Sequence, residues 1–273
     1  MSPFGGSLMG GEGGIGNRVR LVAHCLLVER KDGLLLVDTG AALQDADDPY
    51  ERYGRLFIAS ASARITREAC AVSQIKALGF DPADVRDVVL THLDLDHAGG
   101  LVDFPNANVH VTNAEKSAAL APKTVVEHIR YVQKMWAHAP KWEPHTPSGD
   151  TWNGFEAVRP VDSEADVLLI PLEGHTRGHA AVAVRSPVPN GREWLVHAGD
   201  SYFAETEIHA TPARCPLGLS FYQTFLALDE DARKRNQLRL RTLAADRSAK
   251  VDVFCAHSAT EFERLKNIEA SLA

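Results

Sequence analysis

The feature that most constrains this chain is a run of candidate metal ligands placed directly after a hydrophobic strand. The segment His92-Leu-Asp-Leu-Asp96-His97 follows the apolar residues 88–90 and precedes the glycine pair Gly99-Gly100. Imidazole nitrogens and carboxylate oxygens are ligands that zinc, iron and manganese accept. In an extended turn, alternate side chains point the same way, so those of this segment can converge on one point. The segment is therefore a candidate metal site.

Three further hydrophobic stretches end in a residue that can bind a metal. The stretch 167–172 precedes His175 in the turn Gly174-His-Thr-Arg-Gly-His179, 194–198 precedes Asp200, and 251–255 precedes His257. One such ending is common by chance, whereas four in one chain are not. The series predicts a single site built from several strand ends.

Together these segments resemble the metallo-β-lactamase superfamily. Its pattern is an early Asp after a strand, HxHxDH, a His in a GHTxGH-like turn, a bridging Asp and a late His. The early Asp corresponds to Asp38 in Leu34-Leu-Leu-Val-Asp38-Thr-Gly40, and the resemblance runs from about residue 19 to residue 257. It implies an α/β fold, the four-layered αββα sandwich of the metallo-β-lactamase type. The chain departs from the pattern at Asp94, where the family has its second His.

The resemblance also implies two divalent metal ions, with zinc as the first choice and manganese or iron as alternatives. The implied ligands are His92, Asp94 and His175 for one ion, Asp96, His97 and His257 for the other, and Asp200 as the bridge. Because Asp94 adds a negative charge, the ligand set of the first ion and the identity of the metal stay open. Asp38 would hold a ligand histidine or its loop.

Such a site predicts a binuclear metal-dependent hydrolase. A metal-bridging hydroxide would attack a carbonyl carbon, and Asp96 would carry the proton to the leaving alkoxide. Tyr202, just after Asp200, is a second candidate catalytic residue in contact with substrate. The expected reaction is the opening of a lactone or related carboxylic ester, as in the N-acyl homoserine lactonases. Two alternatives are a phosphodiester or phosphonate hydrolase on the same site and a non-catalytic ligand-binding homologue.

Other branches of the superfamily fit less well. The metallo-β-lactamases proper lack a bridging Asp such as Asp200. Only 16 residues follow His257, so we expect no helical glutathione-binding domain of the glyoxalase II type. The net charge of −7, without a long basic run, disfavours nucleic acid and anionic membranes as partners. The expected partner is a small-molecule ester or lactone, and the oligomeric state stays open, with a dimer among the options.

The composition predicts a globular enzyme in a reducing compartment. The chain has 273 residues, of which 45% are hydrophobic, enough for a sizeable core. The four cysteines lack CxxC spacing and read as free thiols, which predicts a cytoplasmic protein. We see no signal-peptide pattern at the N-terminus and no apolar run of membrane-spanning length.

No clear interdomain linker is visible, so we expect one domain over residues 1–273, which the resemblance implies is metallo-β-lactamase-like. The glycines of residues 1–18 predict a mobile loop there. Residues 19–30 and 33–38 are expected to form a hairpin that turns at Asp32-Gly33. Further strands are predicted at 86–91, 108–112, 155–160, 166–171, 180–186, 194–199 and 251–256. Helices are predicted at 68–79, 113–121, 124–137, 224–245 and 260–271, and a surface loop at 140–147.

Overall fold

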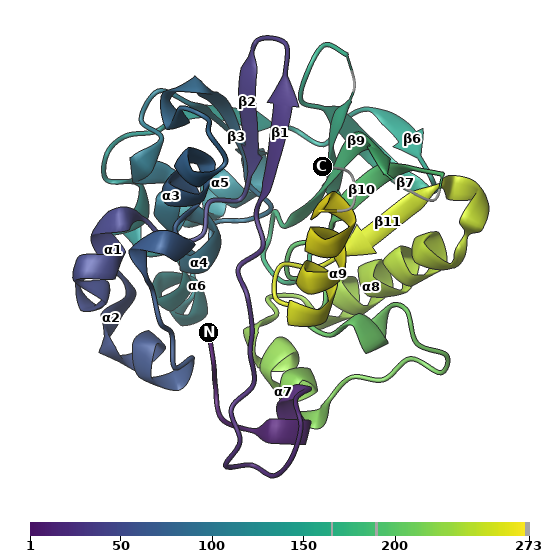
Figure 1. The fold of residues 1–273 in the computed structure, drawn as a ribbon. Helices are drawn as coiled ribbons and strands as arrows, with labels where there is room; N and C mark the ends of the chain where they lie inside the picture. Colours follow the sequence, from purple (N-terminus) through teal and green to yellow (C-terminus); the bar gives the residue numbers. More distant parts are fainter. Residues whose placement is uncertain (165, 189–190, 271–273) are drawn as a thin grey trace. The chain divides into compact units, whose positions relative to one another are not determined.

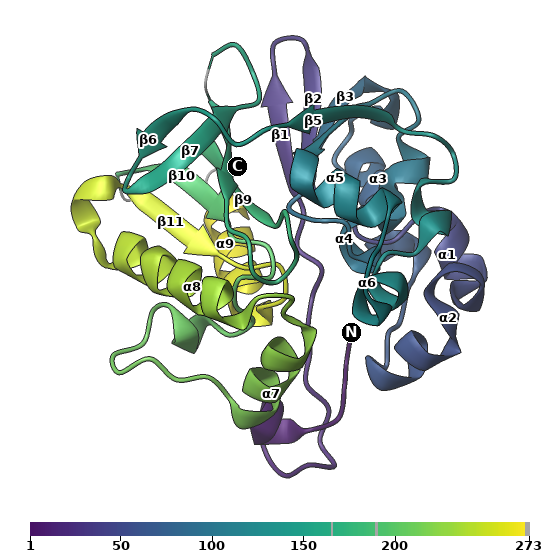
Figure 2. The same ribbon diagram turned by 180° about the vertical axis from the view of Figure 1, so that it is seen from behind.

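A computed structural model of the chain describes residues 1–164, 166–188 and 191–270. The chain divides into two compact units, the first comprising Met1–Pro3 and Ala23–Thr146 and the second Phe4–Val22 and Pro147–Ala273. Each unit contains one β-sheet with helices, which Figures 1 and 2 show from opposite sides. The described residues thus form a mixed α/β protein with two sheets, as the sequence predicts.

The sheet of the first unit has the strand order β1-β2-β3-β4-β5. Its strands are β1 (Leu26–Arg30), β2 (Gly33–Val37), β3 (Val85–Val89), β4 (Asn108–Thr112) and β5 (Lys141–His145). The predicted hairpin is present as β1 and β2, but its first strand begins at Leu26 and not at residue 19, and its turn residues are Lys31 and Asp32. The remaining neighbours pair in parallel. Because parallel strands share one direction, β2, β3 and β4 bring their carboxyl ends to the same edge of the sheet.

Strand β5 corrects the prediction of a loop at residues 140–147. It pairs with β4 so that Pro144 lies opposite Val111. Proline has no N–H to donate, which argues against a central strand but is tolerated at a sheet edge. The prolines were therefore a sign of an edge strand, and the pairing partner that reveals it lies about 30 residues upstream.

Six α-helices are described in the first unit. They are α1 (Leu43–Asp47), α2 (Pro49–Ser60), α3 (Ala71–Ala77), α4 (Leu95–Ala98), α5 (Asn113–Leu120) and α6 (Val125–Arg130). The predicted helix at 124–137 is shorter than expected, because α6 ends at Arg130 and a 3-10 turn follows at Gln133–Trp136. Helix α2 was not predicted, although Asp48 caps it and Pro49 occupies its first position, a recognised start signal.

The sheet of the second unit has the strand order β11-β10-β9-β8-β7-β6. Its strands are β6 (Asp150–Trp152), β7 (Phe155–Pro160), β8 (Val167–Pro171), β9 (Ala180–Val188), β10 (Arg192–His197) and β11 (Val251–Phe254). Strands β8 and β10 both run antiparallel to β9, and β11 runs parallel to β10. The carboxyl ends of β8, β10 and β11 therefore meet at one edge of this sheet.

Three α-helices are described in the second unit: α7 (Leu217–Leu226), α8 (Glu230–Ala245) and α9 (Ala259–Ala270). The helix predicted at 224–245 corresponds to α8, which begins six residues later, at Glu230. Helix α7, most of which lies before residue 224, was not predicted. Asp229 caps α8 by accepting a hydrogen bond from the Ala232 N–H, 2.9 Å away. Helix α8 runs along this sheet in both views, with Leu240 and Leu243 in the core cluster that includes β11.

The glycine-rich N-terminal segment forms a closed loop within the second unit. The N–H groups of Gly5 and Gly6 both donate to the carbonyl of Asn17, each at 3.0 Å. Gly6 has a φ of 46°, and a Cβ built there would lie 2.2 Å from the carbonyl oxygen of Gly14. Glycine is thus required at this turn for both conformation and space. Among the described residues, no helix is long and apolar enough to span a membrane.

Candidate metal centre

In the first unit, the candidate ligands lie where β2 and β3 end. Asp38 follows β2, and Thr91 and His92 follow β3, so the parallel pairing of these strands brings them together. The alternation predicted for an extended turn does not continue beyond Asp94, because Asp94 is the N-cap residue of α4 and Asp96 and His97 lie in that helix. Even so, one ligand atom of Asp96 and one of His97 lie within 4.8 Å of each other.

Asp38 organises the histidines of this loop. Its Oδ1 accepts the backbone N–H of Thr91, and its Oδ2 accepts the Thr91 hydroxyl, both at 2.8 Å. The Nδ1 of His97 lies 2.8 Å from the same Oδ2. Because a carboxylate only accepts, this Nδ1 carries the proton and Nε2 is the ligand atom of His97. The Thr91 hydroxyl lies 2.9 Å from the Nδ1 of His92, so Asp38 positions both imidazoles.

The position at which the sequence departs from the family pattern lies beside His92. The Asp94 Oδ2 is 3.4 Å from the Nε2 of His92. Two atoms that share a tetrahedral zinc ion at about 2.0–2.1 Å lie roughly 3.3–3.4 Å apart. The same Oδ2 accepts a hydrogen bond from Arg130, at 2.6 Å. Arg130 was not singled out in the sequence, because nothing local connects it to a loop 36 residues upstream.

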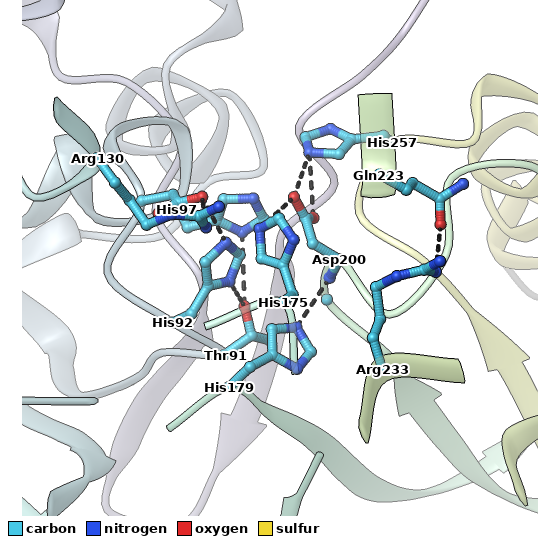
Figure 3. Close-up of polar contacts among 12 residues, drawn as sticks. Thr91, His92, His97, Arg130, His175, His179, Asp200, Gln223, Arg233 and His257 are labelled. Atoms are coloured by element: carbon cyan, nitrogen blue, oxygen red, sulfur yellow. Dashed lines mark hydrogen bonds and ion pairs between the residues drawn. The ribbon is translucent and has the colours of Figure 1, made fainter. Parts of the chain in front are cut away.

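In the second unit, the candidate ligands follow β8, β10 and β11, whose carboxyl ends share one edge. Asp200 contacts two histidines: its Oδ2 lies 3.5 Å from the Nε2 of His175, and its Oδ2 and Oδ1 lie 3.2 and 3.1 Å from the Nε2 of His257 (Figure 3). These separations are close to those of atoms that share a metal ion. The Asp200 carboxylate therefore lies between two candidate ligand histidines, where it could serve as a bridging ligand.

Backbone groups hold these side chains in position. The Nδ1 of His257 donates to the carbonyl of Val22, 2.7 Å away, which makes Nε2 its ligand atom. His179 uses both ring nitrogens structurally: Nδ1 lies 3.1 Å from the carbonyl of Leu172, and Nε2 accepts the Asp200 N–H at 3.0 Å (Figure 3). His179 therefore orders the turn that bears Asp200.

The donor chemistry of both groups fits divalent metal ions. Each group combines imidazole nitrogens with carboxylate oxygens, and His92, His97, His175 and His257 are all at most 2% exposed. Buried carboxylates and imidazoles at ligand spacing are costly to keep unless a cation or donor offsets the charge. The tethers on His97 and His257 resemble those that orient metal-bound histidines in general.

Tyr202 does not occupy the place that the sequence analysis expected. Its side chain is fully buried in the core of the second unit, and its hydroxyl donates to Glu261 at 2.9 Å. Burial, and then the charge of Glu261, raise the pKa of Tyr202 well above its usual value. A neutral phenol held in the core by a neighbouring carboxylate is a structural group, so we withdraw the catalytic role for Tyr202.

Replacing Tyr202 separates the structural role from the catalytic one. Tyr202→Phe removes one donor from Glu261, which keeps the hydrogen bond from the Cys255 N–H at 2.9 Å. We expect the free energy of unfolding in urea to fall by about 1–3 kcal/mol, the value of a hydrogen bond to a charged group, with turnover essentially unchanged. A large loss of turnover at unchanged stability would return Tyr202 to the active site.

The four cysteines are free thiols, as the sequence predicts. Cys255 lies in the core of the second unit, where burial raises its pKa well above the usual value. A thiol that stays protonated is a poor metal ligand, since the thiolate is the form that binds metals. Cys255 is therefore a core residue, although it precedes His257 by two positions.

The tether on His97 makes a testable prediction about metal affinity. Asp38→Asn keeps an oxygen for the Thr91 N–H but turns an amide N–H toward the Nδ1–H of His97. His97 must then move its proton to Nε2, the ligand atom. We expect zinc affinity, measured by competition with a chromophoric chelator, to fall by about 10- to 100-fold, the usual effect of losing a partner that orients a ligand.

The same sheet offers a matched control for Asp38. Asp87, on β3, also bonds a histidine, with Oδ1 3.0 Å from the Nε2 of His110. Asp87→Asn should reduce stability but leave zinc affinity unchanged, because no candidate ligand depends on it. Equal losses of affinity in the two variants would mean that Asp38 acts only through folding.

Comparison with known proteins gives the class of this chain. The metallo-β-lactamase superfamily model matches residues 18–255. A Mycobacterium tuberculosis protein named "Probable metallo-hydrolase" is 40% identical over 240 residues, which cover 88% of this chain and 75% of that protein. The N-acyl homoserine lactonase AttM of Agrobacterium fabrum is 32% identical over 177 residues, 64% of each chain. The chain belongs to the metallo-β-lactamase superfamily, as a metallo-hydrolase similar to its lactonase-like branch.

Solved structures confirm the fold class at low sequence identity. An N-acyl homoserine lactone hydrolase with N-hexanoyl-L-homoserine bound at its catalytic metal centre matches with a TM-score of 0.67 and 20% identity, covering 96% of this chain and 91% of that one. The dizinc quorum-quenching lactonase AidC matches with a TM-score of 0.58 and 19% identity, covering 89% and 74%. The predicted α/β fold of the metallo-β-lactamase type is therefore confirmed.

Proposed function

We propose that this protein opens a lactone or related carboxylic ester at a centre of two divalent metal ions. The proposed ligands are those expected from the sequence: His92, Asp94, Asp96, His97, His175, Asp200 and His257. The observation that most supports Asp200 as their bridging member is its carboxylate, which lies at ligand spacing from the Nε2 atoms of both His175 and His257. Membership of the superfamily and the relatives named lactonases support the choice of reaction.

Two metal ions at such a centre would supply a water activated at neutral pH and would polarise the carbonyl oxygen of the substrate. The protein's own residues provide orientation. Asp38 and the Val22 carbonyl set the tautomers of His97 and His257 so that each offers Nε2. His179 holds the backbone of Asp200, which keeps both carboxylate oxygens in place. Preorganised ligands of this kind need not rearrange during the reaction.

Asp96 is the proposed proton carrier. Its carboxylate lies in the first turn of α4, one residue before His97, and its side chain is only partly buried. A carboxylate oxygen can take the proton released when the ester carbon is attacked and deliver it to the leaving alkoxide. In a lactone that alkoxide stays attached to the acyl product, so protonating it completes the ring opening.

The proposal is tested with purified zinc-loaded protein, elemental analysis and a panel of substrates. The panel contains N-acyl homoserine lactones, simple lactones, aryl esters and phosphodiesters, each assayed with metal-loaded and chelator-treated enzyme. We expect two metal ions per chain and metal-dependent opening of at least one class of lactone. Two bound metals with turnover of phosphodiesters alone would favour the alternative hydrolase, and two metals with no turnover would favour a ligand-binding role.

A further inference from the structure

Arg130 is a buried cation beside Asp94. Its side chain is 4% exposed, and it donates a hydrogen bond to the Oδ2 of Asp94, whose side chain is 15% exposed. Charge-assisted bonds of this kind are about twice as strong as those between neutral groups. An arginine guanidinium keeps its proton in proteins, so Arg130 brings a full positive charge to Asp94.

Two consecutive residues, Arg130 and Tyr131, connect to the loop that bears His92 and Asp94. Helix α6 begins with a capping box in which Thr124 and Glu127 satisfy each other's backbone N–H groups. The helix ends at Arg130, which contacts the Asp94 side chain. The next residue, Tyr131, donates its hydroxyl to Glu115 at 3.2 Å, and Glu115 accepts the Leu93 N–H at 2.9 Å. The loop is thus held both through its side chain and through its backbone.

Asp94 brings an additional negative charge to the proposed centre, and this charge needs a positive partner. With Asp94, Asp96 and Asp200, the proposed ligands bring three negative charges, one more than if a neutral imidazole occupied position 94. Arg130 cancels that additional charge. Removing one member of a buried ion pair leaves the other uncompensated, which is strongly destabilising. Arg130 and Asp94 should therefore be coupled in their effect on metal binding.

We propose that Arg130 is a positioning and charge-balancing residue of the metal centre, and that the Arg130–Asp94 pair takes the place of one neutral ligand histidine. This inference rests on the proposed metal centre, not on the choice of substrate. It predicts the effect of Asp94→His: with Arg130 still present, the imidazole would lie beside a buried cation without its carboxylate partner, and that cation would repel the metal ion.

The test is a set of variants whose zinc affinity and metal-free melting temperature are measured, with no substrate involved. Asp94→His should weaken zinc binding by about 10- to 100-fold and lower the melting temperature by about 5 °C or more. Asp94→His/Arg130→Met removes the unpaired cation and should restore both quantities to near the wild-type values. Asp94→His/Arg130→Lys keeps the positive charge and should restore neither.

Arg130→Met alone tests the pair by removing its cation instead of its carboxylate. It leaves Asp94 without its counter-charge, so the metal-free protein should melt at a lower temperature. Zinc should then stabilise this variant more than it stabilises the wild type, since the metal ion supplies the missing positive charge. A matched control is the half-buried pair of Arg30 and Asp87 in the same sheet. Asp87→His, with or without Arg30→Met, should change the melting temperature and leave zinc affinity unaltered.

Three outcomes would overturn the inference. The Met double variant could bind zinc no better than Asp94→His, or it could fail to fold where Asp94→His folds. The Lys double variant could recover as well as the Met one, which would indicate side-chain shape and not charge. If the wild type binds two zinc ions and opens no lactone, the proposed activity fails while the coupling of Arg130 and Asp94 is still measured.

Discussion

Asp200→Ala is expected to leave at most one tightly bound metal ion per chain and to lower lactone turnover by more than about 100-fold. Even partners that only orient a ligand contribute 10- to 100-fold to affinity or activity, and Asp200 is the proposed ligand of both ions. Its carboxylate contacts both His257, through its two oxygens, and His175, through Oδ2, within the second unit. No other carboxylate among the proposed ligands of that unit could replace it.

The measurement is metal content after gel filtration, followed by turnover of the best lactone at several zinc concentrations. Glu193→Gln is a suitable control, since Glu193 lies on β10, the strand that leads to Asp200, and pairs with Lys250 at the surface. The control should keep two metal ions and full turnover. A single-metal Asp200→Ala protein with wild-type turnover would show that the second ion is not needed.

Asp96→Asn is expected to lower turnover by about 10²-fold or more while both metal ions stay bound. Asparagine keeps an oxygen that can contact a metal ion but cannot carry a proton, and a positioned acid or base contributes typically 10²- to 10⁴-fold. The loss should appear in kcat more than in KM, because the proton is needed when the ring opens and not when the substrate binds.

The control for Asp96 is the same substitution a few residues downstream. Asp103 ends the 3-10 turn after α4 and accepts the Leu43 N–H at 2.9 Å. Burial raises the pKa of Asp103, so it too is a perturbed carboxyl of this region. Asp103→Asn keeps the accepting oxygen and should retain normal kcat. Near-normal kcat in Asp96→Asn with two metal ions bound would exclude a proton-carrying role.

The sequence predicted much of the secondary structure, and the reasons are local. Strands β4 and β7 lie where the predicted strands do, at 108–112 and 155–160. Their hydrophobic residues recur at the spacing that buries one face or both, which is a property of neighbouring residues. The hairpin of β1 and β2 was readable in part: Asp32-Gly33 marked the place of the turn within one residue, but the first strand is shorter than predicted.

The errors in secondary structure have one common cause. Strand β5 contains Pro144 and forms only because β4 offers it a free edge. Most of helix α7 was missed, and the start predicted for the next helix, residue 224, was too early, although the capping aspartate Asp229 marks the start of α8. Local signals for these elements were weak, and pairing with distant residues outweighed them.

The candidate ligands were predictable because each follows a hydrophobic strand, a pattern visible in a few consecutive residues. Which side chains surround them was not predictable, because the partners come from far along the chain. Arg130 lies 36 residues from Asp94, and Glu261 lies 59 residues from the Tyr202 that it holds in the core. Periodicity specifies strands, helices and the polar residues at their ends. Only the tertiary structure decides which buried charges meet. A buried charge loses its hydration, so it is stable only beside a partner, and that partner comes from a distant part of the chain.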